Sequence, residues 1–339
     1  MGTEATLLEV NAMKKYFPIK KGFLKRTVGY VKAVDDVHLT INEGETFGLV
    51  GESGCGKSTL GRCILRAIEP TEGSIKFRNQ KGNVVDITEL SPKDLRNYRR
   101  DMQLIFQDPY SSLNPRMTVL NIIGEPLICN KIASGNQLRE RVKSLMEVVG
   151  LNSKHLERYP HAFSGGQRQR IGIARALATN PRLLICDESV SALDVSIQAQ
   201  ILNLLEDLQE QFNLSYLFIS HDLGVIQHIS DKIGVMYVGK MVESAATDDV
   251  FKNPKHPYTE SLLSAKPVPD PRVKKERIVL QGEVANPANP PSGCYFHPRC
   301  KYAKDICRKK APAFEEVAPG HFAACHFAKD LQLTGAAGQ

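Results

Sequence analysis

The sequence predicts a layered α/β fold, and three observations support that prediction. First, a short apolar segment at residues 46–50 runs into a glycine-rich loop and then into a helical segment at residues 59–68. Second, residues 182–186 and 214–220 are continuous apolar runs, the pattern of strands buried in a parallel sheet. Third, an amphipathic helix at residues 196–211 lies between these runs, and strands that alternate with helices form layered α/β cores.

The composition is that of an ordinary globular protein, with 339 residues, 42% hydrophobic and 24% charged. No apolar run reaches the length of about 18 residues that a membrane-spanning helix needs. Residues 1–20 lack the apolar core of a signal peptide, so we expect a cytosolic location. The chain is long enough for one large domain or two smaller ones.

The net charge of +7 is unevenly distributed. One interpretation of the basic stretch near the N-terminus is a patch that faces phosphate, anionic lipid or nucleic acid. The other, which we favour, is a solvated hairpin loop. The stretch contains no acidic residue, and its basic residues are Lys14, Lys15, Lys20, Lys21, Lys25, Arg26 and Lys32.

The N-terminal part predicts an antiparallel β subdomain beside the α/β core. Short alternating or apolar segments, separated by turn residues, are typical of strands and hairpins. A serine followed by proline predicts the start of a short helix. In order, we expect a strand at 7–13, a basic connection at 17–30, a strand at 34–41, a turn at 42–45, a hairpin at 73–77 and 84–87, a helix at 91–100 and a strand at 102–106.

The middle of the chain predicts a helical subdomain, at about residues 111–180, inserted into the α/β core. Apolar residues recur there at three- and four-residue spacing, which favours helices. The segments with this spacing are 117–128, 138–149 and 167–178. A hairpin at 232–237 and 240–243, around Gly239, follows later.

Near residue 266 the composition changes. Six prolines between residues 266 and 291 predict a linker, and residues 334–339 are expected to be frayed. We therefore predict a first domain at 1–265 and a C-terminal extension at 266–339.

Residues 51–59 match the phosphate-binding loop motif, G-x-x-x-x-G-K-S/T. Glycines let the backbone approach an anion closely, and successive N–H groups then cradle phosphate oxygens. In this motif Lys57 reaches the β- and γ-phosphates and the Ser58 hydroxyl ligates Mg²⁺. The strand before the loop and the helix after it predict a P-loop NTPase core. The expected contact residues are Gly51, Ser53, Gly54, Cys55, Gly56, Lys57, Ser58 and Thr59.

Two carboxylates, Asp187 and Glu188, follow a buried strand. Ligands bind at the carboxyl ends of such strands, so Asp187 is predicted to hold Mg²⁺ and Glu188 to polarise the attacking water. Acidic pairs in this position are also common as surface caps. After a phosphate loop, the functional interpretation is favoured.

A second helix start, Ser164-Gly165-Gly166-Gln167, has the character of an anion site. Alone, this tetrapeptide is more often an N-cap and turn. Two such devices with a single lysine loop suggest a nucleotide that is shared between two subunits.

The order of these motifs resembles the ATP-binding-cassette ATPases over roughly residues 7–265. The resemblance implies ATP and Mg²⁺ as ligands. It implies that Phe17, or alternatively Tyr16, stacks on adenine, and that Gln107 touches Mg²⁺ and senses a transmembrane partner. It also implies that Ser164 to Gln167 close on the γ-phosphate bound by the opposite subunit. Phe163 stands where leucine is more usual. Asp194, in Ser191-Ala192-Leu193-Asp194, resembles the subunit-contact residue, and His221 resembles the switch histidine that holds the γ-phosphate.

Three further segments resemble the oligopeptide/dipeptide/nickel importers, most closely the second ATPase subunit of a peptide permease. They are residues 106–117, 255–259 and 293–300. The resemblance implies ATP-driven import of di- or oligopeptides at the cytoplasmic face of the membrane. The implied partners are a second ATPase subunit in a heterodimer, two permease subunits and an extracytoplasmic peptide-binding protein, without nucleic acid.

Four cysteines near the C-terminus have the spacing C-x₅-C-x₆-C-x₁₇-C: Cys294, Cys300, Cys307 and Cys325. Clustered cysteines in a cytosolic chain favour a metal over disulfides. Four thiolates suit a [4Fe–4S] cluster or Zn²⁺, although the usual C-x₂₋₄-C zinc knuckle is absent. The family resemblance favours the [4Fe–4S] cluster, and zinc or free thiols stay open.

Two alternatives stay open from the sequence. A soluble cassette ATPase could act on nucleic acid, with the basic N-terminal stretch as its contact. An importer could also carry nickel or another small solute, because specificity resides in other subunits. Whether the assembly contains two copies of this chain or two different ATPases is likewise open.

Overall fold

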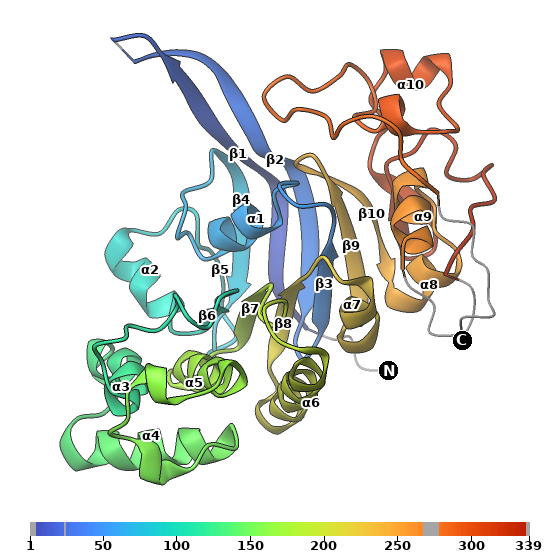
Figure 1. The fold of residues 1–339 in the computed structure, drawn as a ribbon. Coiled ribbons are helices and arrows are strands. Elements are labelled where there is room, and N and C mark those ends of the chain that lie inside the picture. Colours follow the sequence, from blue (N-terminus) through green and yellow to red (C-terminus); the bar gives the residue numbers. More distant parts are fainter. Residues whose placement is uncertain (1–4, 24, 267–277, 337–339) are drawn as a thin grey trace. The chain divides into compact units, whose positions relative to one another are not determined.

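The computed structural model describes residues 5–23, 25–266 and 278–336 (Figure 1). The internal contacts divide the chain into two units. The first consists of Met1–Leu8, Ile41–Glu45 and Lys76–Ile219, and the second of Glu9–Thr40, Thr46–Ile75 and Ser220–Gln339. The predicted domain boundary at residue 265 and the inserted subdomain at 111–180 stay predictions.

The first unit contains a parallel arrangement of three strands. β6 (Met102–Ile105) pairs with β7 (Leu183–Asp187), and β7 pairs with β8 (Ser215–Ile219). Every residue of β7 and β8 is buried. Continuous apolar runs are what strands covered on both faces require, so the prediction from residues 182–186 and 214–220 is confirmed.

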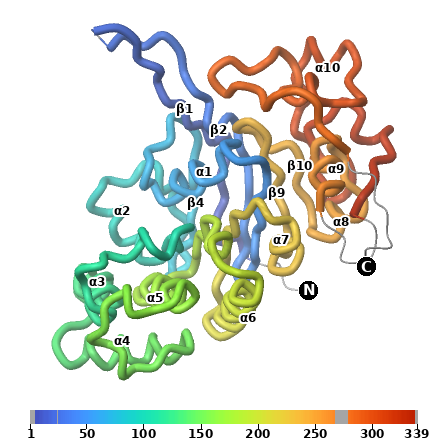
Figure 2. The backbone as a smooth tube through the Cα atoms, viewed as in Figure 1, coloured from blue at the N-terminus to red at the C-terminus, as the bar shows by residue number. Residues whose placement is uncertain are grey.

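Helices make up most of the rest of the first unit. α3 (Val119–Cys129), α4 (Gly135–Val148) and α5 (Gly165–Leu177) pack on one another, as Figure 2 shows, and α6 (Val195–Phe212) connects β7 to β8. α2 (Pro92–Tyr98) begins after Ser91, whose side chain accepts a hydrogen bond from the Asp94 N–H. The four helices predicted between residues 91 and 178, and the one at 196–211, are thus confirmed within a few residues.

The second unit is built around β3 (Thr46–Val50), which pairs in parallel with β9 (Lys232–Tyr237). β9 and β10 (Lys240–Ala246) form the predicted antiparallel hairpin. β10 also pairs with β12 (His321–Ala323), which pairs with β11 (Glu315–Ala318). The C-terminal residues therefore extend the same sheet of this unit. This unit also contains the helices α1 (Lys57–Ile64) and α7 (Leu223–Ile229).

The N-terminal strands form a long hairpin, which corrects one prediction. β1 (Thr6–Lys21) and β2 (Arg26–Asn42) pair through the region expected to be a connection at 17–30. The turn uses Gly22 and Lys25 at positive φ. Most side chains of these distal arms are exposed, and Phe23 is fully exposed. Because the arms bury little, the sequence there lacks the alternation that marks a half-buried strand.

Beyond β10 the structure contains short helices that the sequence analysis did not predict. They are α8 (Thr247–Lys252), α9 (Pro257–Ser264) and α10 (Asp305–Lys309). β4 (Glu72–Arg78) and β5 (Val84–Asp86) form the predicted hairpin. None of the helices in the described ranges is both long and apolar enough to cross a bilayer.

The expected linker is only partly described. Residues 267–277 lie outside the described residues, and residues 278–291 contain no helix or strand. Fraying at 334–336 is wrong, because the Thr334 N–H donates to Glu260 Oε1 at 3.0 Å and the Ala336 N–H to the Phe251 carbonyl at 2.8 Å. Residues 337–339 again lie outside the described part of the chain.

Candidate functional site

The phosphate loop has the backbone that its glycines predict. Gly51, Gly54 and Gly56 have φ values of 151°, 79° and 108°. A Cβ atom at Gly51 would lie 2.2 Å from the Met236 carbonyl oxygen, and one at Gly56 would lie 2.0 Å from the Ala33 carbonyl oxygen. Both positions therefore require glycine on two grounds, the left-handed backbone and the closeness of neighbouring main chain.

Lys57 begins helix α1 and is buried, with 4% of its surface exposed. Its ammonium group donates to the Gly51 carbonyl at 2.7 Å and to the Glu52 carbonyl at 3.1 Å. No side chain caps the N-terminus of α1. A positive helix end beside a held ammonium group is an environment suited to phosphate oxygens.

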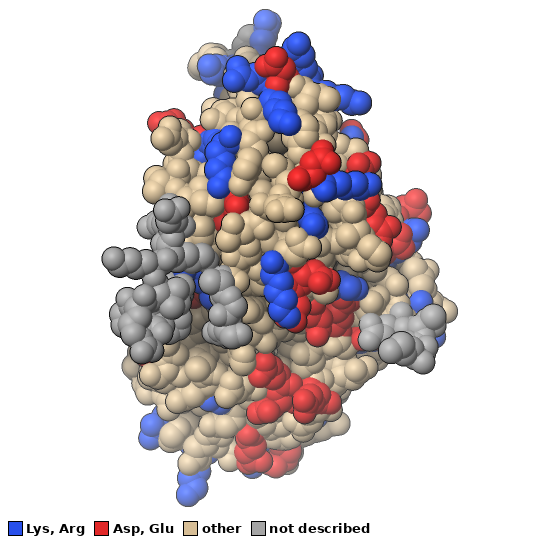
Figure 3. All heavy atoms as spheres, turned by 90° about the vertical axis from the view of Figure 1, so that its right-hand side faces the viewer, with Lys and Arg blue, Asp and Glu red and all other residues tan. Residues whose placement is uncertain are grey.

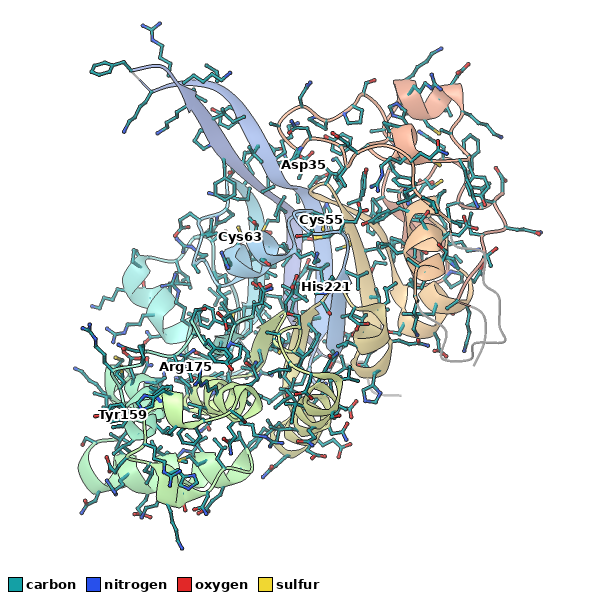
Figure 4. All side chains as sticks on the ribbon, viewed as in Figure 1. Asp35, Cys55, Cys63, Tyr159, Arg175 and His221 are labelled. Carbon is teal, nitrogen blue, oxygen red and sulfur yellow. The ribbon has the colours of Figure 1, made fainter. Side chains whose placement is uncertain are left out.

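An open pocket of about 420 Å³ adjoins the loop. Gly51 and Glu52 line it together with His221, so the structure brings the predicted switch histidine to the phosphate loop within the second unit (Figure 4). Lys266 also lines this pocket, and burial lowers its pKa. Lys266 was not among the predicted site residues, and it lies where the proline-rich composition begins. The remaining lining residues are Val50, Asp222, Leu223, Leu262 and Ala265.

Two predicted catalytic side chains meet in the first unit. The Gln107 Nε2 donates a hydrogen bond to Glu188 Oε2 at 2.9 Å. Asp187, the last residue of β7, is 5% exposed. Glu188 has a φ of 49°, and its N–H donates to the Ile219 carbonyl at 2.9 Å. A glutamate in this sparsely populated backbone region is a feature that clusters at functional sites.

The Ser164–Gln167 segment forms a complete capping box at the start of α5. The Ser164 N–H donates to Gln167 Oε1 at 3.0 Å, and the Gln167 N–H donates to Ser164 Oγ at 3.3 Å. The N-cap interpretation is therefore correct as geometry. A Cβ at Gly165 would meet nothing closer than 3.6 Å, whereas one at Gly166 would lie 2.5 Å from Ile197 Cγ2.

Asp194 occupies the corresponding position at the start of α6. Its side chain accepts a hydrogen bond from the Ile197 N–H at 3.0 Å. Like Ser164, it is a helix cap by geometry, and its predicted role at a subunit contact stays a prediction.

The two aromatic candidates for adenine differ in their surroundings. The Tyr16 hydroxyl donates to Asp35, and Lys32 lies over its ring, 5.5 Å from the centroid. Burial and this hydrogen bond raise the pKa of Tyr16 well above its ordinary value. Phe17 is 38% exposed, with Lys15 on its ring at 4.9 Å. Of the two rings, that of Phe17 is the one without a polar anchor.

The four cysteines of the tail line one small cavity of about 20 Å³. Burial raises the pKa of Cys300 to about 11, that of Cys325 to about 12, and that of Cys294 in the same direction. The Cys294 N–H donates to the Cys307 carbonyl at 2.8 Å. Among the described residues, no three His, Cys, Asp or Glu side chains are arranged to hold a metal ion.

On the face shown in Figure 3, Lys and Arg side chains gather at the top, and basic and acidic side chains both occur over the rest.

Comparison with known proteins identifies the class. A family described as "ABC transporter" matches residues 34–191. The fold resembles a solved dimeric ATP-binding cassette in a post-hydrolysis state bound to ADP and Pi, with a TM-score of 0.62 and 29% identity. That likeness covers 71% of this chain and 99% of the other. Fold and phosphate loop thus define an ATP-binding-cassette ATPase.

The nearer relatives narrow the class. The oligopeptide transport ATP-binding protein AppF of Bacillus subtilis is 56% identical over 326 residues, 95% of this chain and 98% of that protein. The dipeptide transport ATP-binding protein DppF of Haemophilus influenzae is 49% identical over 94% of this chain and 96% of its own length. A family described as "Oligopeptide/dipeptide transporter, C-terminal region" matches residues 242–307. The chain belongs to the ATP-binding-cassette ATPases of oligopeptide/dipeptide transporters, and the predicted resemblance is confirmed.

Proposed function

We propose that this chain is the ATP-hydrolysing subunit that powers import of dipeptides or oligopeptides across the cytoplasmic membrane. The observation that carries the proposal is a built phosphate loop in a chain whose close relatives are named as oligopeptide and dipeptide transport ATP-binding proteins. In this role it works in a cassette dimer docked on two permease subunits at the cytoplasmic face. The second cassette is a different subunit, and an extracytoplasmic protein delivers the peptide. The proposal does not include binding to nucleic acid.

Binding of ATP would be led by the phosphate loop. Lys57, positioned by its hydrogen bonds to the Gly51 and Glu52 carbonyls, would reach the β- and γ-phosphates. The remaining loop contacts are those predicted from Ser53 to Thr59. Phe17 would stack on adenine, since its ring, unlike that of Tyr16, is not held by a hydrogen bond.

The chain also supplies oxygen donors of the kind that Mg²⁺ prefers: the Ser58 hydroxyl, the Gln107 amide oxygen and the Asp187 carboxylate. Asp187 suits this task because it ends the buried strand β7. When bound, Mg²⁺ neutralises charge on the β- and γ-phosphates.

Hydrolysis needs a base that takes a proton from the attacking water, and we assign that role to Glu188. The Gln107 side chain donates to its carboxylate at 2.9 Å and so fixes the orientation of the oxygens. His221, which lines the pocket at Gly51, would hold the γ-phosphate and the water in line. Catalysis of this type is mainly positioning and electrostatic stabilisation.

The Ser164–Gln167 segment would act across the dimer, on the γ-phosphate bound by the opposite cassette. Ser164 and Gln167 are exposed at the start of this 13-residue helix, which supports the role. Asp194 would lie at the same contact between subunits.

The catalytic assignment is tested by Glu188→Gln, which keeps the shape and the hydrogen-bonding reach of the side chain and removes the base. We expect ATP binding to persist and hydrolysis to fall by about 10²- to 10⁴-fold. Glu210→Gln, an exposed change on α6, is the matched control and should hydrolyse ATP normally. Wild-type turnover in the Glu188 variant would sink the assignment.

The transport assignment is tested by co-purification. The tagged Glu188→Gln chain is extracted gently from membranes with ATP present, and its companions are identified by mass spectrometry. Two polytopic permeases and a second cassette support the importer, and the permeases point to the cargo. A chain that stays out of the membrane fraction and carries nucleic acid contradicts it.

We further propose that Cys294, Cys300, Cys307 and Cys325 hold a metal centre, a [4Fe–4S] cluster as the family resemblance implies. The donor set supports this, because four thiols line one cavity. The volume of about 20 Å³ has room for about one water-sized atom, so a cluster requires the thiols to move apart. A single Zn²⁺ needs less movement and is the alternative.

Metal analysis of chain purified without oxygen decides between these centres. Iron and sulfide in equal amounts, with the visible absorption of a cluster, support the cluster. One zinc per chain favours the alternative. Neither metal, with four thiols that react freely with a thiol reagent, overturns the proposal. Cys307→Ser is the informative variant, because Cys307 is buried and should be needed for either centre.

A further inference from the structure

The cysteine-bearing tail contacts the phosphate loop directly through Arg299. The guanidinium donates two hydrogen bonds to the Glu52 carboxylate, Nη1 to Oε2 at 2.8 Å and Nη2 to Oε1 at 3.0 Å. Glu52 is the second residue of the loop, and 247 positions separate the two partners in the chain. Neither the motif nor the proposed catalytic scheme uses this pair.

This pair is partly buried and bidentate. The Arg299 side chain is only 7% exposed, and its Nη1 also lies 3.5 Å from the Tyr237 hydroxyl. The hydrogen bond with Glu52 raises the pKa of Arg299. Two parallel hydrogen bonds from a planar guanidinium fix the direction of a carboxylate as well as its distance, which the point charge of a lysine cannot do.

The backbone of the loop is held by a second contact. The Glu52 N–H donates to the Tyr258 hydroxyl at 2.8 Å. Phe296, three residues before Arg299, packs on the rings of Tyr237 and Tyr258, with centroids 5.3 and 5.4 Å away. Tyr258 of α9 therefore holds the main chain of Glu52, and Arg299 of the tail holds its side chain.

The position of Glu52 matters for Lys57. The Lys57 ammonium donates to the Glu52 carbonyl at 3.1 Å and to the neighbouring Gly51 carbonyl at 2.7 Å. A displacement of Glu52 therefore moves two of the groups that hold the phosphate-binding lysine. Glu52 therefore links the Arg299 guanidinium, through its side chain, to the Lys57 ammonium group, through its carbonyl.

We propose that Arg299 is a positioning residue, which holds the phosphate loop from the C-terminal tail in the geometry that binds ATP. The proposal rests on the proposed function only in taking this loop as the ATP site. The packing of Phe296 positions Arg299. Phe296 anchors the short turn His297–Arg299 against the aromatic rings, and Arg299 directly precedes Cys300.

The test measures ATP affinity and turnover in purified full-length chain carrying Arg299→Gln, Arg299→Lys or Glu52→Gln. We expect the Kd for ATP to rise about tenfold in Arg299→Gln, and less in Arg299→Lys, which keeps charge without the two-pronged geometry. The turnover number at saturating ATP should stay within about twofold of wild type. The double variant Arg299→Gln with Glu52→Gln should bind ATP no more weakly than either single variant, because the two act through one contact.

Arg308→Gln, an exposed arginine of the same tail, is the matched control and should leave the Kd unchanged. A purely structural role would lower the unfolding temperature while leaving the Kd of the folded protein unchanged, and that result overturns the proposal. Additive losses in the double variant also overturn it. If Arg299→Gln does not fold, Glu52→Gln tests the same contact from the other partner.

The failure of the proposed function is recognised separately. Wild-type chain that binds no ATP, with no further loss in Lys57→Ala, contradicts the assignment of the loop as the ATP site. Wild-type chain that binds ATP, with Arg299 and Glu52 variants that bind it equally well, contradicts the positioning role alone.

Discussion

Two glycine-containing loops each lead into a helix, yet their helix starts are built differently. At α1, Gly56 has a φ of 108° and no side chain caps the helix. At α5, Ser164 and Gln167 form a reciprocal capping box. The first start leaves the end of the helix to a ligand and to Lys57, while the second satisfies two of its own backbone groups. Glycine before a helix therefore does not by itself predict a ligand site. The neighbouring residue types decide whether the first N–H groups of the helix are capped by side chains or left for a ligand.

The largest effect is expected from Gly56→Ala. The new Cβ would lie 2.0 Å from the Ala33 carbonyl oxygen, at a backbone angle that costs a non-glycine residue about 1–3 kcal/mol by itself. We expect ATP binding to be lost in nucleotide titrations and the unfolding temperature to fall.

The matched change is Gly165→Ala at the start of α5, where the nearest atom is 3.6 Å from the new Cβ. Its stability should be unchanged or slightly higher, because alanine favours helix. If the two variants lost equal amounts of stability, the distinction between the two helix starts would be wrong.

An intermediate effect is expected from Ser164→Asp. Aspartate caps a helix about as well as serine, so the free energy of unfolding should change by less than about 0.5 kcal/mol. It adds a negative charge where the γ-phosphate of the opposite cassette is proposed to lie. ATP hydrolysis by the assembled dimer should therefore fall by about 10- to 100-fold. Normal hydrolysis would mean that the segment is a cap and nothing more.

The smallest effect is expected from Ser164→Ala. The N-cap hydrogen bond to the Gln167 N–H is lost, which should cost about 1 kcal/mol of stability in urea unfolding. Thr118→Ala at the start of α3 removes an equivalent cap outside the proposed dimer contact and is the control. Similar losses in stability, with a defect in hydrolysis only for Ser164, would separate capping from function.

Local patterns in the sequence predicted much of this molecule. The phosphate loop, the buried strands β7 and β8, and the capped start of α5 each depend on neighbouring residues, so their sequences show them. The hydrogen bond between Gln107 and Glu188 joins two motifs that the sequence analysis had already singled out.

What could not be predicted depends on distant or solvent-facing residues. The pairing of Arg299 with Glu52 joins residues with no shared local pattern, and Arg299 had been noted only as part of the segment 293–300 that resembles the importers. The distal arms of β1 and β2 pair with each other while burying little, so no alternation marked them as strands. Tyr258 lies in the segment 255–259, which resembles the importers, but the sequence assigned it no role.

The contact between Arg299 and Glu52 bears on how this protein can be cut and recombined. A chain shortened after residue 265 keeps every recognised ATPase motif and yet loses the group that holds the second residue of its phosphate loop. Chimeras that exchange C-terminal regions between relatives must match an arginine in the tail with an acid in the loop. The tail and the loop must therefore be kept or exchanged together, although 247 positions of sequence separate Arg299 from Glu52.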